Sequence, residues 1–176
     1  RLIYFSIFKN GIYKRQVLSQ QNYSSETLPY KRGDILDRDG NTLATSQKMY
    51  TLVLEPKNIL RSEEVQKSTI DALHKYMKLD EDKLLKFIKR HKDSYYSVYR
   101  EELSYSQIAD LKDFIASDKA ENVSGIVFNE KYKRRYPNQS LASQVIGFIS
   151  DGTIGTGGIE QYYNSTLSGV DGRKYK

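Results

Sequence analysis

The segment that decides the fold is RGDILDRDGNTLA, residues 32–44. Its centre, Asp39-Gly40-Asn41, is a turn signal, because Gly and Asn tolerate positive φ angles. Extended runs at 35–36 and 42–45 flank this turn, so the sequence predicts a tight β-hairpin. On this pattern alone, mutual pairing or solvent explains the many charged side chains of the segment.

Composition limits the possible classes of protein. The chain has 176 residues, a net charge of +6, 38% hydrophobic and 28% charged residues, which suits one domain with or without a sub-lobe. It contains no Cys, which excludes a disulfide scaffold, a thiol nucleophile and a Cys-ligated metal. The positive excess is modest and spread along the chain, so solubility is sufficient to explain it.

The chain opens with an apolar run, RLIYFSIF at residues 1–8. This run is far shorter than the ~20 residues that span a bilayer. We expect either a buried strand or the tail of a membrane anchor. The absence of an initial Met, together with the abrupt end at Lys176, favours a fragment of a longer protein.

Hydrophobic periodicity predicts the helices and strands of the rest of the chain. Three helices have start signals: Glu63 and Glu64 in a first turn, Asp80 as an N-cap, and Ser104 with Gln107 as a capping box. Expected helices lie at 10–22, 62–77, 81–91, 105–117 and 159–167, and expected strands at 26–31, 50–54, 95–99, 125–136 and 170–175.

The strand predicted over 125–136 has two different faces. One face is mainly apolar, and the other is a basic edge. The first carries Ile126, Phe128, Tyr132, Arg134 and Tyr136, and the second carries Val127, Lys131, Lys133 and Arg135.

Three separated segments together resemble a known family. The first is the opening segment, which fits RG-x-I-x-DR-x-G-x-x-LA. The second is Arg134/Arg135-Tyr136-Pro137, then Leu141-Ala142-Ser143 and Ile146-Gly147, which fits R-x-YP-x-G-x-LA-x-x-x-IG except that Gln139 replaces a Gly. The third, Gly155 to Glu160, fits G-x-x-GIE. In this order they resemble the extracytoplasmic N-terminal region of class B penicillin-binding proteins, the dimerisation or pedestal domain.

The resemblance implies an α+β pedestal with long twisted β elements and a helical head lobe. It further implies a membrane-proximal segment at 1–25 after a missing anchor, a pedestal domain at 26–172 with its head lobe at 56–125, and the start of a linker to a missing transpeptidase domain at 173–176.

The resemblance also implies a set of structural and interdomain residues. We expect the charged ones among them to form ion pairs that tie the separated motifs together near the transpeptidase junction: Arg32, Asp37, Arg38, Arg135 and Glu160. The full set is Arg32, Gly33, Asp37, Arg38, Gly40, Arg135, Tyr136, Pro137, Gly147, Gly158 and Glu160.

We expect the fragment itself to be non-catalytic. The family enzyme needs S-x-x-K, S-x-N and K-T-G type motifs. Ser6 to Lys9 matches the first by spacing but lies in the apolar opening run, and the sequence contains neither of the other two. A nucleophile without a base and an oxyanion hole is inert. The intact parent would be a serine-type D,D-transpeptidase that crosslinks peptidoglycan, and no cofactor or metal is expected here.

The resemblance implies a location and partners. The location is the extracytoplasmic face of the cell membrane, reached through the missing anchor. The partners are the parent's own transpeptidase domain, a glycosyltransferase of the shape-elongation-division type or other divisome or elongasome proteins, and a second copy of the chain, but no nucleic acid.

Two other classes of function stay open on the sequence. Arg32-Gly33-Asp34 is the integrin-binding tripeptide, which would suit a surface adhesin. The basic edge with its interleaved tyrosines would suit single-stranded nucleic acid or an anionic polymer.

Overall fold

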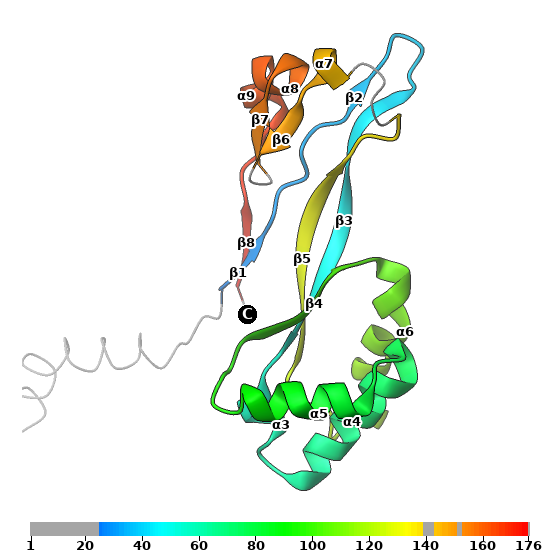
Figure 1. The fold of residues 1–176 in the computed structure, drawn as a ribbon, viewed down its shortest axis with the longest axis vertical. Helices are drawn as coiled ribbons and strands as arrows, with labels where there is room; N and C mark the ends of the chain where they lie inside the picture. The colour runs from blue at the N-terminus through cyan, green and yellow to red at the C-terminus, as the bar shows by residue number, and fades with distance from the viewer. Residues whose placement is uncertain (1–24, 139–142, 151–152, 176) are drawn as a thin grey trace, which may run out of the picture. The chain divides into compact units, whose positions relative to one another are not determined.

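The computed structural model describes residues 25–138, 143–150 and 153–175 (Figure 1). They divide into two units. In the smaller unit, β1 (Ser25–Leu28) pairs antiparallel with β8 (Gly172–Tyr175), so that Leu28 lies opposite Gly172. The larger unit is Pro29–Gly169. The expected helix at 10–22 lies outside the described residues, and within them no helix is both long and apolar enough to cross a membrane.

The sheet of the larger unit is built around one long strand, β3 (Thr42–Leu54). Three strands pair with it antiparallel: β2 (Ile35–Leu36), β4 (Ser97–Leu103) and β5 (Ile126–Arg135). The β2–β3 pair confirms the predicted hairpin, with Ile35 opposite Ala44. The β3–β5 ribbon runs unbroken in register from Thr45 opposite Arg135 to Leu54 opposite Ile126, and Figure 1 shows the two strands side by side along this length.

The head at one end of the ribbon is helical, and the sequence signals start its helices. It contains α3 (Pro56–Ile59), α4 (Glu63–Met77), α5 (Glu81–Arg90), α6 (Tyr105–Ile115) and the 3-10 turn η1 (Asp118–Ala120). The hydroxyl of Ser62 accepts from the amide of Val65 at 3.2 Å, and a carboxylate oxygen of Asp80 accepts from the amide of Lys83 at 2.9 Å. The predicted capping box is present at the start of α6.

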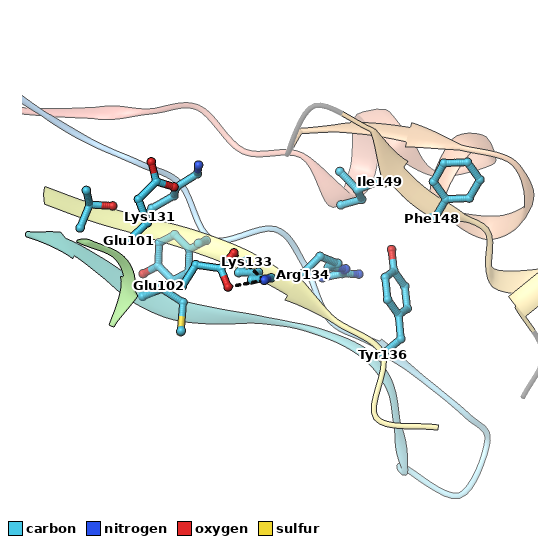
Figure 2. Close-up of a pocket in the computed structure, with 11 residues that line it drawn as sticks. Glu101, Glu102, Lys131, Lys133, Arg134, Tyr136, Phe148 and Ile149 are labelled. Atoms are coloured by element: carbon cyan, nitrogen blue, oxygen red, sulfur yellow. Dashed lines mark hydrogen bonds and ion pairs between the residues drawn. The ribbon is translucent and has the colours of Figure 1, made fainter. Parts of the chain in front are cut away.

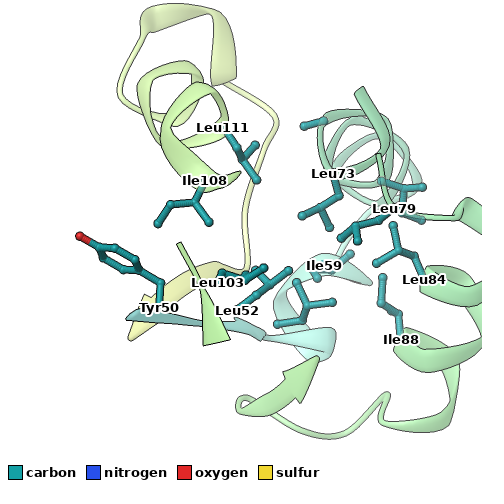
Figure 3. Packing of buried hydrophobic residues seen from close by; sticks show 13 residues of the cluster. Tyr50, Leu52, Ile59, Leu73, Leu79, Leu84, Ile88, Leu103, Ile108 and Leu111 are labelled. Atoms are coloured by element: carbon teal, nitrogen blue, oxygen red, sulfur yellow. The ribbon is translucent and has the colours of Figure 1, made fainter. Parts of the chain in front are cut away.

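The main core lies between these helices and the sheet (Figure 3). Leu52 and Leu54 project from β3, and Leu103 closes β4; all three are fully buried. Opposite them the helices contribute fully buried side chains: Leu73, Leu84, Ile88, Ile108 and Leu111. Since burying one such side chain contributes about 1.5–3 kcal/mol, this cluster is the main source of stability in the head.

A second, smaller lobe lies at the other end of the ribbon. It contains α7 (Ser143–Ile146), β6 (Phe148–Ser150), β7 (Ile154–Thr156), α8 (Gly158–Tyr162) and α9 (Asn164–Leu167). The prediction of one continuous helix over 159–167 was wrong, because the backbone leaves helical geometry at Tyr163, with φ −98 and ψ 21. A separate core of Ile35, Ala44 and Ile146 holds this lobe to the hairpin.

Candidate functional site

Arg32, just before β2, is a buried arginine whose guanidinium is surrounded by acceptors. Its Nε donates to Oε2 of Glu160 at 2.8 Å, and its Nη2 donates to the backbone carbonyl of Glu160 at 2.9 Å. Its Nη1 has three acceptors: Ser168 Oγ at 2.8 Å, Asn164 Oδ1 at 3.0 Å and the Thr153 carbonyl at 3.3 Å. Arg32 therefore fixes the segment before the hairpin to α8 and α9.

Glu160 is the centre of this site and has no exposed surface. Its second carboxylate oxygen, Oε1, accepts from Arg134 Nε at 2.8 Å and from the Tyr136 hydroxyl at 3.3 Å. One carboxylate thus bridges two arginines from distant parts of the chain. We call Arg32, Arg134, Tyr136 and Glu160 the Glu160 cluster.

Arg134, on β5, extends the cluster to the backbone of the first motif. Its Nη1 donates to the Gly33 carbonyl at 2.7 Å and to Ser46 Oγ at 3.1 Å. Its Nη2 is buried, and no described residue accepts a hydrogen bond from it. The cluster contains two positive charges and one negative charge, so its buried charges do not balance.

Two glycines allow α7 and α8 to approach closely enough to bring Glu160 into the cluster. Gly158 has a φ of +50, and a Cβ atom there would overlap the carbonyl oxygen of Val145. Gly147 has a φ of +78, and a Cβ atom there would overlap the carbonyl oxygen of Gly157. Only glycine adopts such angles readily and leaves this space free.

Among the expected interdomain residues, the structure brings Arg32, Gly33, Tyr136 and Glu160 together. Gly33 takes part through its backbone: besides its carbonyl contact, its amide donates to the Leu167 carbonyl at 2.9 Å. Pro137 is exposed and follows directly after Tyr136. The matched Leu141 and Ala142, and Gln139, lie outside the described residues.

Three of the charged residues expected in cross-motif ion pairs do not reach the cluster. Asp37 accepts from the backbone amides of Asp39 and Asn41, both at 2.8 Å, and so closes its own turn, in which Gly40 has a φ of +84. Arg38 is 93% exposed and lies 3.9 Å from its neighbour Asp39.

The third, Arg135, was the wrong arginine. Its Nε donates to Gln47 Oε1 at 3.0 Å on the exposed side of the ribbon. Arg134 occupies the place expected for it. The strand alternation already grouped Arg134 with Tyr132 and Tyr136, and the R-x-YP spacing also selects position 134, so the sequence contained the signal for this residue.

The structure removes the basis for the adhesin interpretation. A receptor that recognises Arg32-Gly33-Asp34 must contact the arginine side chain, and that side chain is 5% exposed and engaged by Glu160. The basic edge is also partly occupied: Lys133 Nζ is 2.6 Å from a carboxylate oxygen of Glu102.

The protonation of the neighbouring groups supports a structural role. Burial raises the pKa of Tyr136, and the negative charge of Glu160 raises this pKa further, so the phenol keeps its proton and donates a hydrogen bond to Glu160. The pKa of Asp37 is lowered, first by the Asn41 side-chain amide, whose nitrogen is 2.8 Å from the carboxylate. Apart from Nη2 of Arg134, the polar groups of the Glu160 cluster are engaged within the protein, which suits a rigid joint rather than a reaction centre.

Comparison with known proteins agrees with the fold. The profile of the family described as Penicillin-binding Protein dimerisation domain matches residues 27–176. Stage V sporulation protein D of Bacillus subtilis is 29% identical over 155 residues, which cover 84% of this chain and 22% of that protein. Peptidoglycan D,D-transpeptidase FtsI of Buchnera aphidicola is 28% identical over 82% of this chain and 24% of its own length.

A solved structure gives the same result. Penicillin Binding Protein 2X of Streptococcus thermophilus superimposes with a TM-score of 0.69 at 26% identity, over 85% of this chain and 24% of that one. The chain therefore spans about a quarter of the length of these relatives. The expected α+β fold is confirmed.

Proposed function

This chain belongs to the penicillin-binding protein dimerisation domain family, and from that membership we propose that it is a non-catalytic pedestal that positions a D,D-transpeptidase domain for peptidoglycan crosslinking. The observation that carries the proposal is the Glu160 cluster. It joins the first, second and third motifs through buried ion pairs of 2.8 Å, which gives a neighbouring domain a fixed base.

The proposal includes a location and partners. The pedestal acts at the extracytoplasmic face of the cell membrane, to which an anchor outside the described residues attaches it. Its partners are the transpeptidase domain of the same polypeptide, a membrane glycosyltransferase or other division or elongation proteins, and a second copy of the chain. Support for the transpeptidase domain comes from the relative named peptidoglycan D,D-transpeptidase FtsI, of which the matched region is only 24% of the length.

The absence of catalysis has a direct test. Incubation of the chain with a fluorescent penicillin, followed by denaturing electrophoresis and mass spectrometry, should give no covalent adduct. Penicillin Binding Protein 2X of Streptococcus thermophilus, treated in parallel, is the positive control. A stoichiometric adduct on this chain would overturn the non-catalytic assignment.

The pedestal assignment is tested in the gene that encodes the chain. Its sequence downstream of the codon for Lys176 should encode S-x-x-K, S-x-N and K-T-G type motifs, in that order. In the protein so defined, Glu160→Gln should leave the rate of penicillin acylation of the purified enzyme nearly unchanged and should reduce crosslinking in cells. The matched control is Glu130→Gln, on the exposed Lys48 pair. An unrelated downstream domain would contradict the proposal.

A further inference from the structure

A hollow of about 300 Å³ lies beside the Glu160 cluster, between the β3–β5 ribbon and β6. We call it the Arg134 hollow. Figure 2 shows Arg134 between Lys133 and Tyr136, with Ile149 and Phe148 on the opposite side. Its volume lies at the lower end of the range for small-molecule sites, which are mostly apolar with a few oriented polar groups.

The charge beside the hollow is positive and incompletely compensated. Arg32 and Arg134 share one carboxylate, and Tyr136 keeps its proton, because burial raises its pKa, and so adds no negative charge. The Nη2 atom of Arg134 is buried and has no acceptor among the described residues. An unmet buried donor is costly, and more so on a charged group, so an anion that accepts from this atom removes part of that cost.

The rim of the hollow limits the charge of the ligand. Lys133 is already engaged by both carboxylate oxygens of Glu102, each at 2.6 Å. Lys131 forms no ion pair with any described residue, although its charge helps to lower the pKa of Glu102, and Glu101 also lines the hollow. One further negative charge is therefore balanced by Arg134 and Lys131, whereas a second would face Glu101 and Glu102 without a cation to receive it.

The opposite wall is apolar and accessible. Phe148 is 57% exposed although it is a large aromatic side chain, and Ile149 follows it on β6. The exposed Phe148 and the half-buried Ile149, which line a hollow next to an unmet cation, suit a ligand with an apolar body and one anionic end.

We propose that the Arg134 hollow binds an apolar monocarboxylate, whose carboxylate accepts from Nη2 of Arg134 and whose apolar body lies against Phe148 and Ile149. Nη2 is itself covered, so binding requires movement of the side chains that cover it. The same chemistry occurs in a free acyl chain and in an apolar C-terminal residue of a peptide. This inference is independent of the pedestal function.

The first test compares charged and neutral forms of two probes. Octanoate and octanol, and acetyl-Gly-Leu with a free or an amidated C-terminus, are titrated into the chain of 176 residues and followed by calorimetry and by ¹H–¹⁵N NMR. Each carboxylate should bind at least about tenfold more tightly than its neutral form, because one charged hydrogen bond contributes roughly 1.5–3 kcal/mol. Whichever of the two acids binds more tightly shows whether the ligand is an acyl chain or the C-terminus of a peptide. Equal binding of acid and neutral form, or binding of neither acid, would overturn the proposal.

The second test locates the site with matched variants. Phe148→Ala should weaken octanoate binding severalfold, whereas Ile154→Ala, on the neighbouring strand and equally exposed at 57%, should not. Arg134→Lys should weaken octanoate binding more than Arg135→Lys does, because the side chain of Arg135 contacts Gln47 instead. If Arg134→Lys fails to fold, the Phe148 and Ile154 pair still decides. Equal affinities in that pair would place binding elsewhere and refute the proposal.

Discussion

At the scale of single residues, Glu160 combines full burial with two arginine partners. Each of its two carboxylate oxygens accepts a 2.8 Å hydrogen bond from a different guanidinium. The guanidiniums of Arg32 and Arg134 are both buried, and the Glu160 carboxylate is the negative charge that offsets the cost of burying them. The stability of this part of the molecule should therefore be unusually sensitive to a change that removes the charge and keeps the shape.

Glu160→Gln is such a change, and we expect it to lower the free energy of unfolding by about 3–5 kcal/mol, because it leaves two buried guanidiniums without a counter-ion. Urea denaturation followed by circular dichroism measures this loss. The control is Glu130→Gln, which breaks the Lys48 pair at the surface and should cost no more than about 1 kcal/mol. Similar losses in both variants would show that burial of the cluster contributes little.

Asp37 gives a pH-dependent prediction. Its carboxylate accepts hydrogen bonds within its own turn, the Asn41 side chain being the largest cause, so its pKa in the folded state is below the ordinary value of 3.8. The resulting stabilisation is complete above the unfolded-state pKa and is lost as the pH falls through the folded-state pKa. An NMR titration of the Asp37 carboxyl carbon should therefore have its midpoint below 3.8.

Asn41→Ala is the matched variant for this titration. It removes the side-chain donor and keeps the backbone one, so the Asp37 midpoint should move up towards 3.8. An unchanged midpoint would assign the lowered pKa to the backbone amides instead.

At the scale of elements, local signals in the sequence predicted the three long helices of the head well, since caps and periodicity act within a few residues. The head helix α4 was expected at 62–77 and spans Glu63–Met77. The β4 strand was expected at 95–99 but spans Ser97–Leu103, because polar residues at 100–102 hide its pattern while the strand pairs with β3. The C-terminal end of β4 is set by its pairing with β3, and the local sequence pattern does not indicate this end.

Gly158 tests the close approach of α7 and α8. Gly158→Ala should lower the free energy of unfolding by more than the ~1–2 kcal/mol that a left-handed backbone costs a residue with a Cβ atom, because that atom also overlaps the Val145 carbonyl oxygen. Thermal and urea denaturation give the value. Gly40→Ala separates the two causes, since Gly40 has a φ of +84 but no atom within 4 Å of an added Cβ. Equal losses at both positions would exclude the steric contribution.

At the scale of the larger unit, the site joins residues that are far apart in the sequence. Arg32 and Glu160 are 128 positions apart, and Arg134 and Gly33 are 101 apart. The presence of three different family motifs in order predicted that these segments lie close together in the fold. The choice between Arg134 and Arg135, however, depended on which face of β5 turns inward.

The two cores of this unit give a test of cooperativity. Leu73→Ala should destabilise the head by about 2–5 kcal/mol, because it opens a cavity in the main core. Native-state hydrogen exchange should then accelerate in α4 and α5 but not at the amide of Gly33, whose bond to Leu167 belongs to the other lobe. Leu36→Ala, at an exposed position, is the control. Equal acceleration at all these amides would show a single folding unit.

The pairing of β3 with β5 limits which insertions and deletions can change the length of the ribbon. β3 has 13 residues and passes without interruption from the hairpin to the head. One residue inserted into it would reverse the facing of every side chain beyond that point, whereas two residues, matched by two in β5, would preserve all facings and add about 7 Å. Viable changes of length in this part of the molecule therefore come in paired steps, so relatives with longer or shorter ribbons should differ by even numbers of residues in both strands.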